Sequence, residues 1–187
     1  MLIIINYNNI TDDIIVFMEF LEVVKKRKAI RKYLDKSVSD ELVSKILETV
    51  NLAPSAGNLQ AFKILIIKNK NKKKKVSEIC FDQEFISEAP VVFVFLAKPK
   101  EAGKQYGERG EVLYAIQDAT IAATYTILTA SSLGLSTCWV GAFDKDDLKK
   151  ELNTEFLPIC VIPLGYGAEN PKRRPRKKIS EISEIID

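Results

Sequence analysis

The stretch Pro90 to Ala97 reads Pro-Val-Val-Phe-Val-Phe-Leu-Ala and contains no polar side chain. Such an uninterrupted apolar run predicts a strand that is buried on both faces of a sheet. On either side of this run, segments with helix-like and strand-like patterns alternate along the chain. We expect further strands over Phe62 to Lys68, Ser136 to Val140 and Pro158 to Leu164, and helices over Glu19 to Lys26, Ser39 to Ala53, Leu113 to Leu133 and Asp144 to Leu152.

The helix over Leu113 to Leu133 is apolar on nearly every side, which indicates that protein surrounds it, in a core or at a subunit interface. The uncharged stretch Ala119 to Phe143 is long enough to cross a bilayer. Its serines and threonines and the turn residues near Gly134 argue against a membrane span. We therefore expect a buried helix followed by a buried strand.

Three polar segments connect or follow these elements. Lys98 to Gly110 is expected to be a polar loop, because glycines interrupt it. Asn69 to Lys75 is expected to be a charged connection that runs into a short helix. Its Lys72 to Lys75 run could bind nucleic acid, but such a run is more often a solvated surface. Ala168 to Asp187 is expected to be a basic tail that packs little core of its own.

Composition excludes several classes of function. The 187 residues are 47% hydrophobic, which suits one domain with a real core. The absence of histidine excludes Ser-His-Asp and Cys-His catalysis and histidine-based zinc sites, so we expect no metal. A net charge of +3 is too small to indicate nucleic acid as a partner. The cysteines lack Cys-x-x-Cys spacing and lie in apolar stretches, which indicates buried thiols and a reducing, cytoplasmic compartment: Cys80, Cys138 and Cys160.

Arginine is used sparingly, and it is clustered at the two ends of the chain. Arg27 and Arg31 would share a face if their backbone were helical. Arg174 and Arg176, which follow Arg173, would share a face if theirs were extended. The planar guanidinium group suits phosphate in a way that lysine does not. The two clusters could therefore converge on one phosphate; scattered surface charge is the alternative.

Two connections have the small residues that let a flat ligand approach the backbone. Ala53 to Gln60 follows a helix and offers polar side chains at Ser55, Asn58 and Gln60. Thr137 to Asp144 follows a strand and leads into a helix N-cap, so its backbone amides could bind a cofactor. Each could also be an ordinary connection without a ligand.

Taken together and in this order, these segments resemble the signatures of the nitroreductase family. The resemblance covers roughly Phe20 to Asp187. It rests on Arg27 to Tyr33, Ala53 to Gln60, Tyr114 to Asp118, Gly134 to Phe143, Ile162 to Tyr166 and Arg174 to Glu181.

This resemblance implies an α+β fold, with a mixed, mostly antiparallel sheet flanked by helices, in an intertwined homodimer that buries the long central helix. FMN would lie at the subunit interface. One chain would bind the cofactor through Arg27, Lys28, Ala29 and Arg31, and Arg174 and Arg176 of that chain would complete a phosphate clamp. Beside the flavin ring would lie Val140, Gly141 and Ala142, with the Gly141 amide near N5. The other chain would contribute Pro54, Ser55, Ala56 and Asn58.

The sequence departs from the family pattern at two positions. Ala29 stands where the family often has serine, so one hydroxyl contact would be lost. Lys178 replaces the usual proline in the tail, which leaves the path of the tail open.

The function implied is an FMN-dependent oxidoreductase. Electrons would pass from NADH or NADPH through flavin N5 to a small acceptor such as a nitroaromatic, a quinone or an enone. The alternatives are a flavin-binding carrier or sensor without turnover, and a dehalogenase-type enzyme of a related branch. Those branches usually carry an extra lid, and a short Lys98 to Gly110 loop would argue against one. No nucleic-acid or membrane partner is expected.

The first residues match nothing in the family pattern. Leu2 to Ile5 and Ile14 to Phe17 are apolar, but the family-like part begins near Met18. We therefore expect residues 1–17 to be an extension that is not part of the working fold, and residues 18–187 to form the FMN-binding domain.

Overall fold

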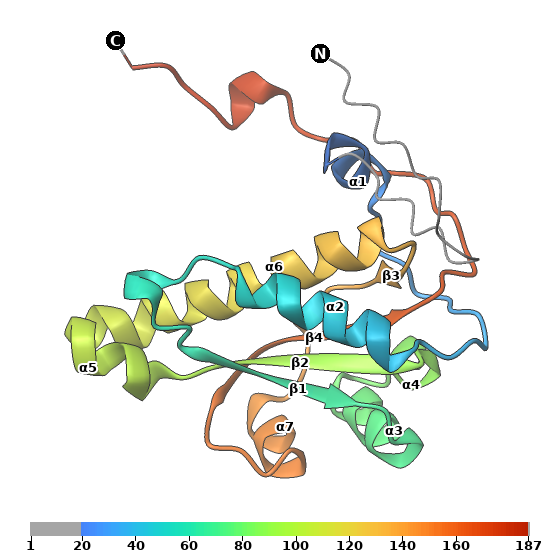
Figure 1. The fold of residues 1–187 in the computed structure, drawn as a ribbon, viewed down its shortest axis with the longest axis horizontal. Helices are drawn as coiled ribbons and strands as arrows, with labels where there is room; N and C mark the ends of the chain where they lie inside the picture. The colour runs from blue at the N-terminus through green and yellow to red at the C-terminus, as the bar shows by residue number, and fades with distance from the viewer. Residues whose placement is uncertain (1–19, 187) are drawn as a thin grey trace, which may run out of the picture.

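A four-stranded antiparallel sheet runs through the middle of the molecule, in the order β1-β2-β4-β3 (Figure 1). The computed structural model describes residues 20–186, and the expected extension over residues 1–17 lies outside that part. The strands are β1 (Phe62–Ile67), β2 (Val91–Ala97), β3 (Ser136–Thr137) and β4 (Leu157–Gly165). Every residue of β2 is buried, so the expected buried central strand is confirmed.

Helices cover both faces of this sheet. Successive side chains of a strand point to opposite faces, so Phe93 and Phe95 pack on one side while Val92 and Val94 pack on the other. The first side is covered by α2 (Asp40–Asn51) and α6 (Ala115–Ser132) (Figure 1). The second is covered by α3 (Lys70–Ile79), α4 (Phe85–Glu88) and α7 (Lys145–Glu151). The fold is therefore α+β.

Local signals in the sequence define several helix starts. Ser39 caps α2 by accepting a hydrogen bond from the Leu42 amide. Asp144 caps α7 by accepting from the amides of Asp146 and Asp147. Both N-caps were expected from the side-chain type, because a short oxygen-bearing side chain satisfies amides that have no partner in the first turn.

The segment expected to be a polar loop over Lys98 to Gly110 is instead helical. It forms α5 (Pro99–Arg109), followed by a π-helical turn, η2 (Gly110–Tyr114), that leads into α6. Pro99 at the first helical position favours the start of a helix. The glycines have other uses: Gly107 takes φ 58° at a kink, and Gly110 is buried where a Cβ atom would strike the carbonyl of Ala102. The expectation of a loop was wrong because these glycines were read as turn signals.

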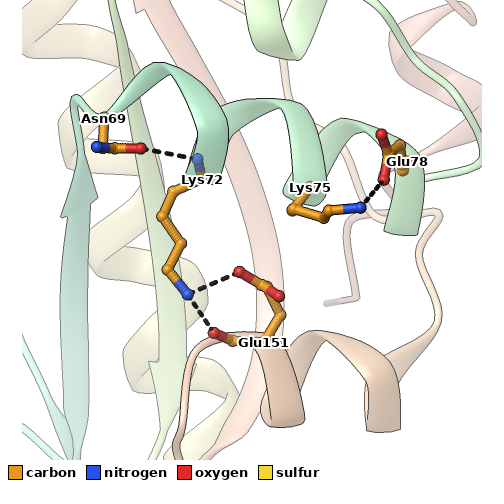
Figure 2. Close-up of polar contacts among 5 residues, drawn as sticks. All are labelled: Asn69, Lys72, Lys75, Glu78 and Glu151. Atoms are coloured by element: carbon orange, nitrogen blue, oxygen red, sulfur yellow. Dashed lines mark hydrogen bonds and ion pairs between the residues drawn. The ribbon is translucent and has the colours of Figure 1, made fainter.

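The lysine run is also more ordered than expected. Helix α3 begins directly after Asn69, whose side chain accepts from the Lys72 amide (Figure 2). Lys72 donates to Glu151 of α7, and Lys75 pairs with Glu78. Lys73 is buried and donates to the carbonyl of Ala89 at the end of α4. The expected solvated surface is therefore wrong for Lys73, whose ammonium links α3 to α4.

The remaining elements lie at the edges of the fold. Helix α1 (Phe20–Lys26) packs near the C-terminal end of α6, and the tail after β4 is exposed and runs past α1 (Figure 1). Within residues 20–186, no helix has the length and hydropathy that a membrane span requires. The three cysteines are free and buried, as expected.

Candidate cofactor site

A small basic pocket lies where the end of α1 meets the end of α6 and β3. Its volume is about 150 Å³, and its polar lining combines the cations of Lys26, Arg27 and Lys28 with hydroxyl and amide groups and one carboxylate, that of Glu169. Helix α1 stops at Lys26, and the chain then runs beside β3, where the Ile30 amide donates to the Thr137 carbonyl at 3.0 Å. The residues that line the pocket include Arg27, Lys28, Ser131, Ser136, Thr137 and Asn170.

The charges around Arg27 show that cations converge there. The pKa of Arg27 is lowered, first by burial and then by the positive charges of Arg173 and Arg176. Like charges held close together repel one another, and an anion placed among them relieves this repulsion. Arg27 from one end of the chain therefore lies within electrostatic reach of Arg173 and Arg176 from the other end.

The C-terminal tail is fastened to the segment that follows α1. The Arg173 guanidinium donates to the carbonyls of Val24, Lys25 and Arg27, the last at 3.0 Å. Lys28 donates to the Asn170 side chain at 2.6 Å. These contacts use the unpaired carbonyls at the end of α1, where a cation is favoured. They hold this part of the tail beside the pocket, and the charge of Arg176 lies close enough to lower the pKa of Arg27.

Two residues of the expected cofactor-binding segment Arg27 to Arg31, namely Ala29 and Arg31, do not line the basic pocket. Because the helix ends at Lys26, Arg27 and Arg31 do not share a helical face. The Arg31 guanidinium lies over the Phe85 ring, 5.7 Å from its centroid, and does not line the basic pocket. Its backbone amide donates to the Glu169 carboxylate at 2.5 Å. Ala29 is exposed and forms a parallel bridge with Thr137.

The expected flavin-contact segment leaves β3 and crosses back to the sheet. The strand expected over Ser136 to Val140 is shorter, because only Ser136 and Thr137 pair continuously with β4. Val140 then exchanges two hydrogen bonds of 2.9 Å with Val161. Gly141 and Ala142 are exposed, and within residues 20–186 the Gly141 amide donates to no protein acceptor. That amide is available for a ligand.

The second expected loop contains the short helical turn η1 (Ala56–Asn58) and is bound mainly to itself. Ser55 Oγ accepts from the amide of Gln60 at 2.9 Å, and the Gln60 side chain donates to Asn58 Oδ1 at 2.6 Å. The free donors are therefore the Ser55 hydroxyl and the Asn58 side-chain NH₂. The Ala56 amide already donates to Asp118 Oδ1 at 2.9 Å, so it is not a free donor.

The two halves of the expected site lie far apart in one chain. The loop contacts α6 at Asp118, whereas the basic pocket contacts the same helix at Ser131. About 13 residues separate these positions, or roughly 20 Å along the axis of a helix. Figure 1 shows this separation, with α5 near one end of α6 and α1 near the other.

Sequence reasoning missed three residues that organise these regions. Arg173 was seen in its cluster but not chosen, and its role depends on carbonyls that only the structure brings near. Tyr106 belongs to the segment that was read as a loop. Asp118 carried a usable signal, because an acidic residue in an otherwise apolar helix is rare without a specific partner. Among the described residues, no group of three acidic, cysteine or histidine side chains converges on a metal site.

Comparison with known proteins identifies the fold and the family. The family model described as "Nitroreductase family" matches residues 24–86 and 80–166. A "Putative NADH dehydrogenase/NAD(P)H nitroreductase" of Methanothermobacter thermautotrophicus is 32% identical over 163 residues, covering 84% of this chain and 82% of its own. The FMN reductase (NAD(P)H) of Bacillus subtilis is 30% identical over 173 residues, covering 84% and 70%.

A solved structure agrees with these sequence matches. The nitroreductase family protein from Streptococcus pneumoniae TIGR4 superposes with a TM-score of 0.81 at 25% identity, covering 90% of this chain and 100% of its own. The helices, the antiparallel sheet and the order of the signature segments are thus accounted for together. This chain belongs to the nitroreductase family.

Proposed function

We propose that this protein is an FMN-dependent oxidoreductase that uses NADH or NADPH and reduces a small acceptor. Its family includes relatives named for NAD(P)H-dependent oxidoreduction and for FMN reduction. The observation that carries the proposal is the basic pocket, where Arg27 and Lys28 meet hydroxyl groups within reach of the charges of Arg173 and Arg176. Guanidinium and hydroxyl donors around a small cavity suit a phosphate monoester.

The pocket favours FMN over a dinucleotide. A pyrophosphate is usually held by a Gly-x-Gly-x-x-Gly turn before a helix, and the sequence contains no such motif. The pocket volume of about 150 Å³ is also below the roughly 300–1,000 Å³ of a complete small-molecule site. We infer that the pocket holds one end of the ligand, the phosphate, while the rest extends beyond it.

The chain contributes position and charge. A bound flavin supplies the redox chemistry, accepting a hydride from the nicotinamide and passing electrons to the acceptor. Arg27, Lys28, Arg174 and Arg176 neutralise the phosphate, and the exposed Gly141 amide offers a donor to the ring. Because the cofactor carries the reactive atoms, the site needs no histidine, and the chain has none.

We further propose that each site is shared between two chains. The loop and the basic pocket are roughly 20 Å apart on α6 of one chain, so a symmetric pair would bring the loop of one to the pocket of the other. Exposed apolar side chains on α1 suit such an interface: Phe20, Leu21 and Val24.

The acceptor is proposed as a class only: a nitroaromatic, quinone or enone. The segment Lys98 to Gly110 gives no reason to exclude a lid, because α5 and η2 replace the expected short loop and Tyr106 of α5 reaches Gly57 in the cofactor loop. A dehalogenase-type branch therefore remains the second candidate. Halogenated aromatic substrates belong in the same acceptor screen.

The test is direct. We expect purified protein to be yellow and to release FMN on heating, with NADH or NADPH bleaching the bound flavin under anaerobic conditions and an acceptor restoring the colour. Chromatography that identifies FAD, or protein that takes up no flavin, would contradict the proposal. Bound FMN that neither nicotinamide bleaches would instead identify a carrier or sensor.

A further inference from the structure

The cofactor loop has a backbone that few residues adopt without support. Gly57 has φ 54°, Asn58 has φ 58° and Gln60 has φ 44°. For residues with a side chain this left-handed region is costly, and it persists only where the surroundings hold it in place. Something in the fold must therefore fix this loop.

Contacts hold the loop from two sides. On its outer side, a Cβ atom added to Gly57 would meet the Tyr106 hydroxyl, so α5 lies directly against the loop. On its inner side, Asp118 of α6 accepts a hydrogen bond from the Ala56 amide at 2.9 Å. Ala56 immediately precedes the left-handed residues, so fixing its peptide group fixes where they begin.

Asp118 is an unusual residue to use for this purpose. It is only 2% exposed, and its second oxygen, Oδ2, is buried without a hydrogen-bond partner among the described residues. Burying a carboxylate with one oxygen unpaired is unfavourable for folding, so a group of this kind calls for a specific reason. An apolar residue would suit this helix better if packing were all that mattered.

We propose that Asp118 is a positioning residue for the cofactor. Its carboxylate holds the Ala56 amide, and through it the Gly57–Asn58 turn, in the conformation that presents the Ser55 hydroxyl and the Asn58 side chain to FMN. The inference rests on the proposed function, because it assigns a purpose to the loop. It concerns a residue outside the expected binding set, and one that does not touch the ligand itself.

The experiment removes the hydrogen bond from each side. Asp118→Ala removes the acceptor, and Ala56→Pro removes the donor. Proline is compatible with this site because Ala56 opens the turn and Ser55, at φ −143° and ψ 157°, has the extended backbone favoured before proline. Asp118→Asn keeps an acceptor oxygen at the same distance. Thr126→Ala is the matched control, because Thr126 is fully buried on the same helix and bonds only to the Ala122 carbonyl.

Each variant is titrated as apo-protein with FMN by fluorescence quenching, and its stability is measured by urea unfolding. We expect Asp118→Ala and Ala56→Pro each to raise the Kd for FMN roughly tenfold or more. The double variant should be no worse than either single change, because both remove one bond. Asp118→Asn should stay within about threefold of wild type. The visible circular dichroism of bound flavin should change in the loosened variants, since the loop no longer holds the ligand in one geometry.

The outcomes are decisive for each claim separately. Wild-type protein that binds no FMN would contradict the proposed function. If wild type binds and Asp118→Ala binds equally well, or if Thr126→Ala loosens FMN as much at an equal loss of stability, Asp118 is structural only. Additive effects of the two loop changes would also overturn the inference, because they would then act through different contacts.

Discussion

The basic clamp and the cofactor loop are expected to bind the same ligand through different kinds of interaction. The clamp, defined here as Arg27, Lys28, Arg173, Arg174 and Arg176, consists of exposed or half-buried cations that a tail brings together. The loop, Pro54 to Asn58, contains no charged residue, and its left-handed backbone at Gly57 and Asn58 is held by the buried carboxylate of Asp118.

This difference indicates that the clamp contributes mainly to the affinity for the ligand and the loop mainly to the geometry in which the ligand is held. Cations that repel one another until an anion arrives gain interaction energy on binding, and they tolerate small shifts in position. A loop fixed in advance adds fewer contacts, but it presents them without reorganisation when the ligand binds. Changes in the clamp should therefore alter affinity most strongly and change its salt dependence, whereas changes in the loop should alter affinity less and also change how the flavin is held.

The largest effect is expected from the double variant Arg174→Ala with Arg176→Ala. Each charge-assisted contact contributes about 1.5–3 kcal/mol, so the loss of two should raise the Kd for FMN by at least roughly a hundredfold. The measurement is a titration of apo-protein at two salt concentrations, with a weaker salt dependence in the variant. Lys172→Ala with Lys177→Ala removes the same charge from the same tail as a control. Equal behaviour of the two double variants would mean that the arginines act only as general positive charge.

The next effect concerns the loop alone. In Gly57→Ala the new Cβ meets the Tyr106 hydroxyl, and the residue must keep a positive φ, so stability should fall by more than about 1 kcal/mol in urea unfolding. Gly134→Ala is the control for backbone strain, because Gly134 has φ +73° and nothing within 4 Å of an added Cβ. Adding Tyr106→Phe to Gly57→Ala should recover the steric part. Equal losses at the two glycines would show that α5 does not press on the loop.

A smaller effect is expected at the anchor of the tail. Arg173→Ala removes three contacts to the carbonyls that end α1. Because the side chain is exposed, we expect a loss of only about 1 kcal/mol in the free energy of unfolding of the apo-protein. Arg174→Ala serves as the comparison and should leave apo stability unchanged. If Arg173→Ala is equally neutral, the tail is not held by these bonds.

The smallest effect is a difference in the pH dependence of stability between a cysteine in the core, Cys80, and a cysteine near the clamp, Cys138. Burial raises the pKa of the Cys80 thiol to about 12, while that of Cys138 is raised by burial but pulled back by the charges of Arg31 and Arg27. Above about pH 9 the unfolded chain loses thiol protons that the folded chain keeps, so stability falls as pH rises. At pH 9.5 the Cys80 thiol lowers stability by about 1 kcal/mol. Cys80→Ala should flatten the pH profile between pH 8 and 10 more than Cys138→Ala; the reverse order would contradict this account.

Much of the fold follows from local sequence signals, and the failures have physical causes. The buried strand β2, the caps Ser39 and Asp144, and the long helix depend on side-chain types within a few residues. Helix α5 was missed because glycines within and after it were read as turn signals, whereas Gly110, at the start of η2, is needed for close packing against the Ala102 carbonyl. The burial of Lys73 could not be predicted from the lysine run either, because it depends on the Ala89 carbonyl that the end of α4 brings to its ammonium group.

The candidate site divides in the same way. Arg27 and the tail arginines were predicted to converge, and the structure brings Arg27, Arg173 and Arg176 within electrostatic reach. The part played by Arg173 could not be foreseen, because it depends on the exact end of α1. The direction of the Arg31 side chain could not be predicted either, because α1 ends at Lys26 and the guanidinium of Arg31 therefore lies over the Phe85 ring. The sequence thus shows which charged residues are present, and the path of the chain determines where their side chains point.

The most direct test of the shared site uses two inactive variants that complement each other. One carries Arg27→Ala with Arg174→Ala in the clamp, and the other carries Ser55→Trp with Asn58→Trp in the loop. Each should be inactive alone but should purify as a folded dimer. When the two are unfolded together and refolded, random pairing gives about half mixed dimers, each with one site that carries both lesions and one intact site. The account predicts NAD(P)H-dependent activity of about a quarter of that of refolded wild type; a mixture that stays inactive while wild type refolds fully would show that each site belongs to a single chain.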